Sequence, residues 1–200
     1  MTRRSEPFLV AAVQASPVFL NRDATVERAC SLIAEAASKG ARLVVFPEGY
    51  LPGYPFWVWF IPSGNTRALR ELYAELLDNS VSVSDASTER LCAAAREAEV
   101  TVAMGINERN SEASGATLYN SLLFIGPEGD VLGCHRKLVP TVGERIVHGQ
   151  GDGSTLQVHD SPVGRVSGLI CWENYMPLAR YALYAGGAQI HVAPTWDRGE

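Results

Sequence analysis

Short apolar runs alternate along the chain with stretches in which apolar residues recur at helical spacing. Residues 8–14 form an apolar run that ends at Gln14, which is typical of a buried strand. Apolar positions from Val26 to Ala37 recur every three or four residues, and Gly40 follows them, as glycine often follows a helix. A second apolar run at 41–46 is stopped by Pro47. This order predicts a strand–helix–strand unit of an α/β protein.

The same alternation continues toward the C-terminus. Two helical stretches, at about 66–78 and 86–99, lead into an apolar run at 100–106. Residues 118–125 and 131–138 flank a short segment rich in turn-forming residues, which predicts an antiparallel hairpin and therefore a mixed sheet. The remaining elements are expected as a strand at 155–158, a turn at 160–162, a strand at 163–170, a helix at 177–185 and a strand at 188–193.

Two segments share one residue pattern. Residues 40–47 and 187–194 each have the order glycine, alanine, polar residue, four mostly apolar residues and proline. The pattern predicts two related half-units packed together in one domain. The second half-unit ends at 196–200 with no closing helix or strand, so we expect the domain to lack its C-terminal part.

Composition narrows the class of protein. Of 200 residues, 46% are hydrophobic and 20% are charged, which is usual for a globular chain and excludes a disordered one. The net charge of −5 argues against nucleic-acid binding, which needs a basic face. No apolar stretch approaches the roughly 18 residues of a membrane span. The four cysteines lie far apart without metal-ligand spacing, so we expect a cytoplasmic protein with neither disulfides nor a zinc site.

Two chemically capable side chains follow predicted strands. Cys171 comes directly after the strand at 163–170, and Glu48 comes just after the strand at 41–46. Proteins of the α/β class bind ligands at the carboxyl ends of their strands. A free cysteine is most often a small buried hydrophobe. The interpretation of Cys171 as a nucleophile therefore depends on the residues around it.

Lys137 and Glu144 complete a possible catalytic set. A cysteine thiol with a pKa of about 8.5 is mostly protonated at neutral pH and needs a base. Glu48 can accept that proton, while the Lys137 ammonium can keep Glu48 ionised and stabilise developing charge. Glu144, seven residues after Lys137, can orient a water molecule. Each of these charges alone is more often a solvated surface group, so the hypothesis rests on finding them together with Cys171.

Three motifs carry a resemblance to a known family. Phe46-Pro47-Glu48, the segment 135–141 (His-Arg-Lys-Leu-Val-Pro-Thr) and Cys171-Trp172-Glu173-Asn174 occur in the order found in the nitrilase superfamily of carbon–nitrogen hydrolases. The chain resembles this family over essentially its whole length. The resemblance implies an αββα sandwich, with two sheets face to face and helices outside. It also implies that residues 1–200 form a carbon–nitrogen hydrolase domain without its C-terminal part.

The resemblance also implies roles for the four residues. Cys171 would be the nucleophile, Glu48 the general base, Lys137 the stabiliser of the tetrahedral intermediate, and Glu144 an accessory carboxylate. The implied reaction is hydrolysis of a small-molecule nitrile to a carboxylic acid and ammonia. It proceeds through a thioimidate and a thioester on Cys171, without a cofactor or a metal ion. We further expect a homo-oligomer.

Other motifs resemble the nitrilase branch rather than the amidases. They are Cys171-Trp172-Glu173, the segment 52–55 (Pro-Gly-Tyr-Pro) and the Gly-rich segment 149–153. We expect substrate contacts from Tyr54, Trp57, Trp172 and Glu173, because the organic group of a nitrile must be held by apolar walls. The aromatic residues could equally fill the core. Ile146-Val147-His148 departs from the family pattern, in which an aromatic residue is usual shortly after Glu144-Arg145.

Three alternatives remain open at the level of sequence. An amidase or an N-carbamoyl hydrolase would use the same four residues and reach the same thioester. A papain-like hydrolase would pair Cys171 with a histidine, and the candidates are His135, His148, His159 and His191. A catalytically silent assembly subunit would keep the fold and lack turnover.

Overall fold

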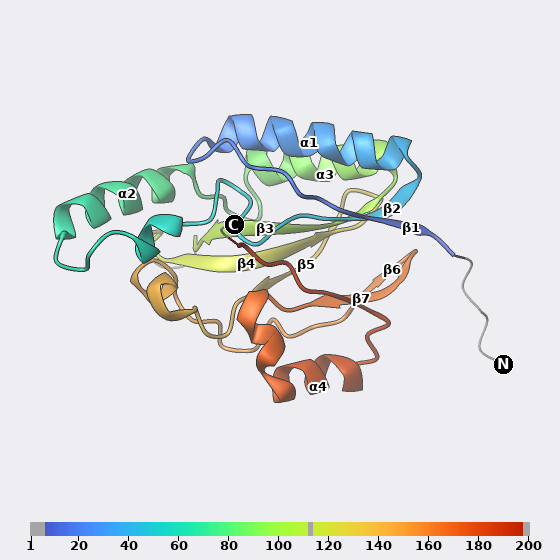
Figure 1. Cartoon of the computed structure of the whole chain (residues 1–200). Coiled ribbons are helices and arrows are strands. Elements are labelled where there is room, and N and C mark those ends of the chain that lie inside the picture. Colours follow the sequence, from blue (N-terminus) through green and yellow to red (C-terminus); the bar gives the residue numbers. More distant parts are fainter. Residues whose placement is uncertain (1–6, 112–113, 198–200) are drawn as a thin grey trace.

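The computed structural model describes residues 7–111 and 114–197. Figure 1 shows helices above and below two stacked sheets. The described strands are β1 (Leu9–Ala12), β2 (Ala41–Val45), β3 (Thr101–Arg109), β4 (Leu118–Ile125), β5 (Val131–Arg136), β6 (His159–Ser161), β7 (Gly164–Gly168) and β8 (Ile190–Val192). The α-helices are α1 (Arg22–Ser38), α2 (Thr66–Asn79), α3 (Ala86–Ala98) and α4 (Pro177–Ala185), and the 3-10 helices are η1 (Phe56–Trp59), η2 (Val142–Ile146) and η3 (Cys171–Tyr175).

The larger sheet has the order β1-β2-β3-β4-β5, with β1, β2 and β3 parallel and β4 and β5 antiparallel to their neighbours. The predicted mixed sheet, the first strand–helix–strand unit and the β4–β5 hairpin are therefore confirmed. Helix α1 begins where the Asn21 side chain accepts from the backbone N–H of Ala24. It ends before Gly40, whose φ of +87° takes the chain into β2.

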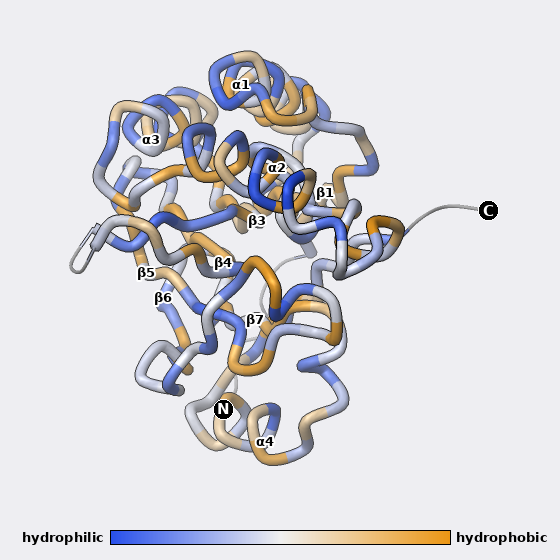
Figure 2. Tube along the Cα trace, turned by 90° about the vertical axis from the view of Figure 1, so that its left-hand side faces the viewer, coloured by the Kyte–Doolittle hydropathy of each residue, from blue (hydrophilic) through white to orange (hydrophobic). Residues whose placement is uncertain are grey.

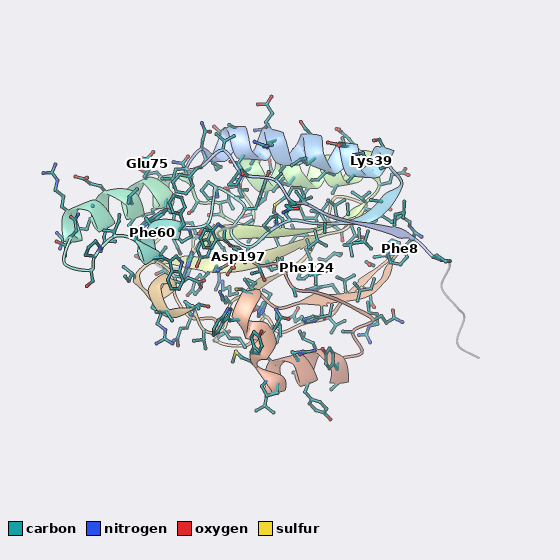
Figure 3. All side chains as sticks on the ribbon, in the orientation of Figure 1. Phe8, Lys39, Phe60, Glu75, Phe124 and Asp197 are labelled. Carbon is teal, nitrogen blue, oxygen red and sulfur yellow. The ribbon has the colours of Figure 1, made fainter. Side chains whose placement is uncertain are left out.

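The layers follow the order α, β, β, α (Figures 1 and 2), and apolar clusters lie between them. Helices α1 and α3 cover one face of the five-stranded sheet, where Ile33 packs in the same cluster as Met104. The other face packs on β6, β7 and β8, and Phe124, labelled in Figure 3, shares that inner layer with Val166. Helix α4 packs through Leu183 on the outer side of the smaller sheet. The predicted αββα sandwich is confirmed.

The C-terminal half corrects two element boundaries. The strand expected at 155–158 is wrong: the Thr155 hydroxyl accepts from the backbone N–H of Arg136 and contacts the His135 ring, so side-chain bonds hold this segment beside β5. Strand β6 instead occupies 159–161, where a turn was expected, and pairs antiparallel with β7. The chain reverses at Pro162 and Val163.

The two patterned segments occupy equivalent places in two strand–helix–strand units. Strand β2 follows α1 and pairs parallel with β1, while β8 follows α4 and pairs parallel with β7. The carboxyl ends of β2 and β8 lead to Glu48 and Trp196, which meet through a hydrogen bond. No helix within the described ranges is long and apolar enough to cross a membrane.

Candidate active site

A buried lysine lies at the centre of the candidate site. Lys137 follows β5 directly, and its side chain is 0% exposed. Its Nζ donates to Oε1 of Glu48 at 2.7 Å and lies 2.9 and 3.0 Å from the two carboxylate oxygens of Glu144. Burial alone would lower the pKa of Lys137, but the two carboxylates outweigh it and the pKa is raised. The structure therefore holds a charged ammonium between two carboxylates.

Glu48 is held by contacts from three different parts of the chain. Besides Lys137, Asn120 on β4 donates from Nδ2 to Oε1 at 2.9 Å, and the backbone N–H of Trp196 donates to Oε2 at 2.9 Å. Burial raises the pKa of Glu48, the Lys137 charge opposes this, and the Glu144 carboxylate adds to it. A carboxyl group with a raised pKa is better suited to accept a proton near neutral pH than an ordinary glutamate.

The backbone at Glu48 approaches β3 unusually closely. A Cβ placed on Gly105 of β3 would lie 2.0 Å from the carbonyl oxygen of Pro47 and 2.9 Å from Cα of Glu48. Glycine is thus required at this strand position for Glu48 to reach Lys137. Leu51 continues along β3, since its N–H donates to the Gly105 carbonyl.

Glu144 sits in η2 and is fixed from both sides. Its Oε2 accepts from the backbone N–H of Thr141 at 3.0 Å, and its Oε1 accepts from the Tyr54 hydroxyl at 2.7 Å. Trp59 donates from Nε1 to the same Tyr54 oxygen at 3.2 Å. Burial and the Glu144 carboxylate raise the pKa of Tyr54, so this phenol remains a hydrogen-bond donor.

Cys171 lies in a strained turn. Strand β7 ends at Gly168, and Cys171 opens η3 with a φ of +53°, a left-handed conformation that is costly for a residue with a side chain. Its N–H donates to the Pro194 carbonyl at 2.9 Å, and the Asn174 side chain donates to the carbonyls of Leu169 and Cys171. These bonds hold the turn in place at the end of the smaller sheet.

The Cys171 thiol is protonated at neutral pH. Burial is the main cause that raises its pKa to about 11, and the charge of Glu48 adds to the effect while that of Lys137 opposes it. Because only a thiolate attacks efficiently, the proton must leave as the new bond forms. Glu48 is the carboxylate whose charge acts most strongly on this thiol.

Glu173 does not fit the substrate contact that the sequence predicted. Its side chain is 0% exposed. Its Oε1 accepts from the N–H of Leu138 at 2.7 Å, its Oε2 accepts from the N–H of Ile170 at 2.8 Å, and His135 lies 3.2 Å away. The Glu173 carboxylate thus links the backbone of Leu138, next to Lys137, to the backbone of Ile170, next to Cys171, and holds the two segments in place.

The other three predicted substrate contacts, Tyr54, Trp57 and Trp172, lie in different environments. A cleft of about 720 Å³ opens beside Glu48, and Tyr54 lines it together with Trp196, whose ring stacks on Tyr54 at 4.5 Å. Trp57 is instead buried in an apolar cluster around α2. Trp172 is 66% exposed and faces away from the core. Of the four predicted substrate contacts, only Tyr54 lines this cleft, as far as the described residues show.

Sequence reasoning missed Asn120, Asn174 and Trp196. Asn120 interrupts an apolar strand, and a polar residue buried in such a run is a usable signal for a hydrogen-bonded position. Asn174 was within a quoted motif without a role. Trp196 carries no such signal, because it contributes a ring stack on Tyr54 and a backbone N–H bond to Glu48, which lies 148 residues away in the chain.

The four histidines all have partners other than Cys171. Their contacts are His135 with Glu173 and Thr155, His148 with Asn107, His191 with Asn174 and Ser167, and His159 with the Phe124 ring. The papain-like alternative is therefore not favoured. Within the described ranges, no three His, Cys, Asp or Glu side chains are grouped to hold a metal ion.

An αββα sandwich of this kind, with a buried lysine held between two glutamates and a cysteine in the turn after β7, defines the class as the nitrilase superfamily. The carbon–nitrogen hydrolase family model matches residues 9–199, and the chain belongs to that family. It is 46% identical over 92% of its length to a bifunctional nitrilase/nitrile hydratase of Nicotiana tabacum, covering 53% of that protein. It is 42% identical over 92% of its length to an aliphatic nitrilase of Rhodococcus rhodochrous, covering 46%.

Solved structures agree on the fold. Nit3 of Saccharomyces cerevisiae superposes with a TM-score of 0.74 at 20% identity, covering 93% of this chain and 63% of that one. A double mutant of the amidase from Nesterenkonia sp. AN1 gives 0.71 at 20% identity, covering 100% and 69%. The chain spans about half the length of the curated relatives it matches.

Proposed function

We propose that the protein hydrolyses an organic nitrile to a carboxylic acid and ammonia, with Cys171 as the nucleophile. The observation that carries the proposal is the fully buried Lys137 ammonium held between Glu48 and Glu144. Burying three charged groups at one sheet edge costs desolvation energy, and such clusters are typical of functional sites. The relatives named nitrilases support the nitrile as substrate.

The chemistry follows from the placement of these groups. Cys171 Sγ bonds to the nitrile carbon while Glu48 takes the thiol proton and passes it to the nitrile nitrogen, giving a thioimidate. Water then adds to that carbon, and the carbon–nitrogen bond breaks to release ammonia and leave a thioester. A second water, deprotonated by Glu48, releases the acid and returns the proton to sulfur.

Lys137 and Glu144 support these steps. The Lys137 ammonium is positioned to stabilise negative charge as it develops on the nitrogen, and later on the oxygen, of the attacked group. Glu144 holds Lys137 in place at 2.9 Å and accepts from Tyr54. It also orients the attacking water in this proposal.

An amidase or N-carbamoyl hydrolase is the alternative, since the same thioester lies on both paths. The test offers a nitrile and the amide with the same organic group to the protein, and measures acid and ammonia from each. We expect equal amounts of acid and ammonia from the nitrile, at a higher kcat/KM than from the amide. Faster turnover of the amide would replace the proposal with an amidase, and no release from either would favour the silent assembly subunit.

Gly105→Ala tests whether the placement of Glu48 matters. The added methyl would push the Pro47–Glu48 backbone away from β3. A displacement of about 1 Å in a catalytic group costs roughly 100-fold in rate, so we expect a loss of about that size in ammonia release. Gly64→Ala is the matched control, because nothing lies within 4 Å of its added carbon. Equal rates for the two variants would contradict the expectation.

We also propose that the protein is a homo-oligomer. Large apolar side chains gather on η3 and α4, and Tyr175 and Leu178 are each 82% exposed there. Such a surface is typical of a contact between proteins. Light scattering on the purified protein should give a mass of at least two chains, and a monomer at micromolar concentration would contradict this.

Cytoplasmic location is part of the proposal. All four cysteines are free, as is usual in reducing compartments. Cell fractionation should recover the protein with cytoplasmic markers, and recovery from the periplasm or medium would overturn this.

A further inference from the structure

A buried asparagine holds the loop that carries two site residues. Asn107 on β3 is 0% exposed. Its Nδ2 donates to the carbonyl of Gly53 at 3.0 Å and also lies 3.3 and 3.5 Å from the carbonyls of Leu51 and Gly49. These carbonyls belong to the segment that joins Glu48 to Tyr54. The Asn107 amide thus fixes the path of the backbone between a candidate base and the phenol that contacts Glu144.

His148 fixes the orientation of that amide. The Asn107 Oδ1 atom lies 2.8 Å from His148 Nε2. Because both amide hydrogens of Asn107 face carbonyl oxygens, its Oδ1 is an acceptor and His148 Nε2 must carry the proton. Burial lowers the pKa of His148 to about 4, so the ring is neutral and donates from Nε2 alone.

The backbone of the same histidine is tied to the backbone of Glu144. The backbone N–H of His148 donates to the carbonyl of Glu144 at 2.7 Å, and the next residue, Gly149, donates to Leu118 on β4. The imidazole is therefore held at a fixed place relative to η2. One end of the His148–Asn107 pair is anchored beside Glu144, and the other end holds the loop that begins at Glu48.

We propose that His148 and Asn107 form a buried positioning pair that sets the separation of Glu48 and Glu144 on the two sides of Lys137. The proposal rests on the proposed function of that site. The side chains of the pair bond to each other and to the carbonyls of the loop, so the pair acts on the site through the loop and through η2. The Tyr54–Glu144 hydrogen bond is the second link between the same two segments.

Loss of the pair should change the acidity of Glu48. Lys137 is the charge that lowers the Glu48 pKa, whereas burial and Glu144 raise it. Among the described residues, the charged or titratable groups that act on Glu48 are Lys137 after β5, Glu144 in η2, Cys171 in η3 and the Tyr54 phenol, and Asn120 and Trp196 add uncharged donors. If the loop drifts and the Glu48–Lys137 contact lengthens inside a buried site, the Glu48 pKa rises.

The experiment compares His148→Phe with His148→Gln. Phenylalanine keeps the ring without its N–H, whereas glutamine keeps a donor that can reach Asn107. His159→Phe is the matched control, because His159 is a buried histidine that packs on Phe124 between the sheets. The readouts are the titration midpoint of the Glu48 carboxyl carbon by ¹³C NMR, assigned with Glu48→Gln, and kcat and KM for nitrile hydrolysis.

For His148→Phe we expect the Glu48 midpoint to move up by about 0.5 pH or more. We also expect kcat to fall about tenfold while KM stays within about twofold. His148→Gln should restore both values, and His159→Phe should move neither. An unmoved midpoint in His148→Phe, or an equal change in His159→Phe, would overturn the positioning role.

Asn107→Ser tests the pair from the other side. It should raise the Glu48 midpoint as well, and adding His148→Phe to it should produce no further change, because coupled residues act as a unit. Additive shifts in the double variant would contradict the pair. The NMR readout needs no turnover, so a parent protein that releases no ammonia would refute the proposed function while the Glu48 midpoints still decide this proposal.

Discussion

Replacing Cys171 with alanine should abolish ammonia release while leaving the fold intact. The thiol is the one group of the proposed site that can form a covalent bond with the nitrile carbon. The loss should reach about 10⁴-fold or more, as for other enzymes that lose their nucleophile. The turn should persist in the variant, because its bonds to Pro194 and Asn174 use the backbone of residue 171 and not its side chain.

Cys92→Ala is the control for this variant. Cys92 lies on α3, on the outer face of the larger sheet, and has a half-buried thiol like that of Cys171. Its removal should leave the rate within about twofold of the parent, as expected for a change away from the site. Both variants should show the circular dichroism of the parent. Unchanged ammonia release from Cys171→Ala would refute its assignment as the nucleophile.

Lys137→Arg should also lower the rate strongly, although the substitution conserves the positive charge. The Lys137 ammonium lies within 3.0 Å of three carboxylate oxygens in a fully buried space. A planar guanidinium is larger and directs its donors in a fixed fork, so it cannot occupy that space without moving Glu48 or Glu144. We expect kcat to fall by about 100-fold or more, since misplaced electrostatic groups cost this much in comparable sites.

Lys39→Arg provides the comparison for an ordinary lysine. Lys39 pairs with Glu35 on the exposed side of α1, and its side chain is 71% exposed. The same substitution there should leave kcat and stability unchanged within error, because exposed pairs contribute little. If Lys137→Arg instead keeps most of the parent kcat, charge alone suffices and the compact ammonium is not required.

Elements whose contacts are local were predictable from the sequence. The strand–helix–strand unit from β1 to β2 follows from the spacing of apolar residues and from Asn21 and Gly40 at the ends of the helix. The strand expected at 155–158 is wrong because the order of polar and apolar residues does not show which backbone a segment will pair with. There the Thr155 hydroxyl bonds to β5 and replaces strand pairing.

In the candidate site too, the sequence predicted the positions of key residues but not their long-range hydrogen bonds. Glu48 and Cys171 follow predicted strands and Lys137 lies near the end of one, and the structure places Glu48 and Glu144 on this lysine. The three partners of Glu173 come from segments up to 38 residues away, so its sequence motif did not predict them. A sequence pattern gives the residue type but not the hydrogen bonds that the residue makes once it is buried.

Trapping the covalent intermediate tests the central claim most directly. The protein is mixed with a nitrile, quenched with acid during turnover and digested, and the four cysteine-containing peptides are analysed by mass spectrometry. We expect the peptide with Cys171 to carry the mass of the bound nitrile or of its acyl group, while ammonia and acid appear in equal amounts. Ammonia release with Cys171 unmodified, or an adduct on Cys30, Cys92 or Cys134 instead, would contradict the proposed mechanism.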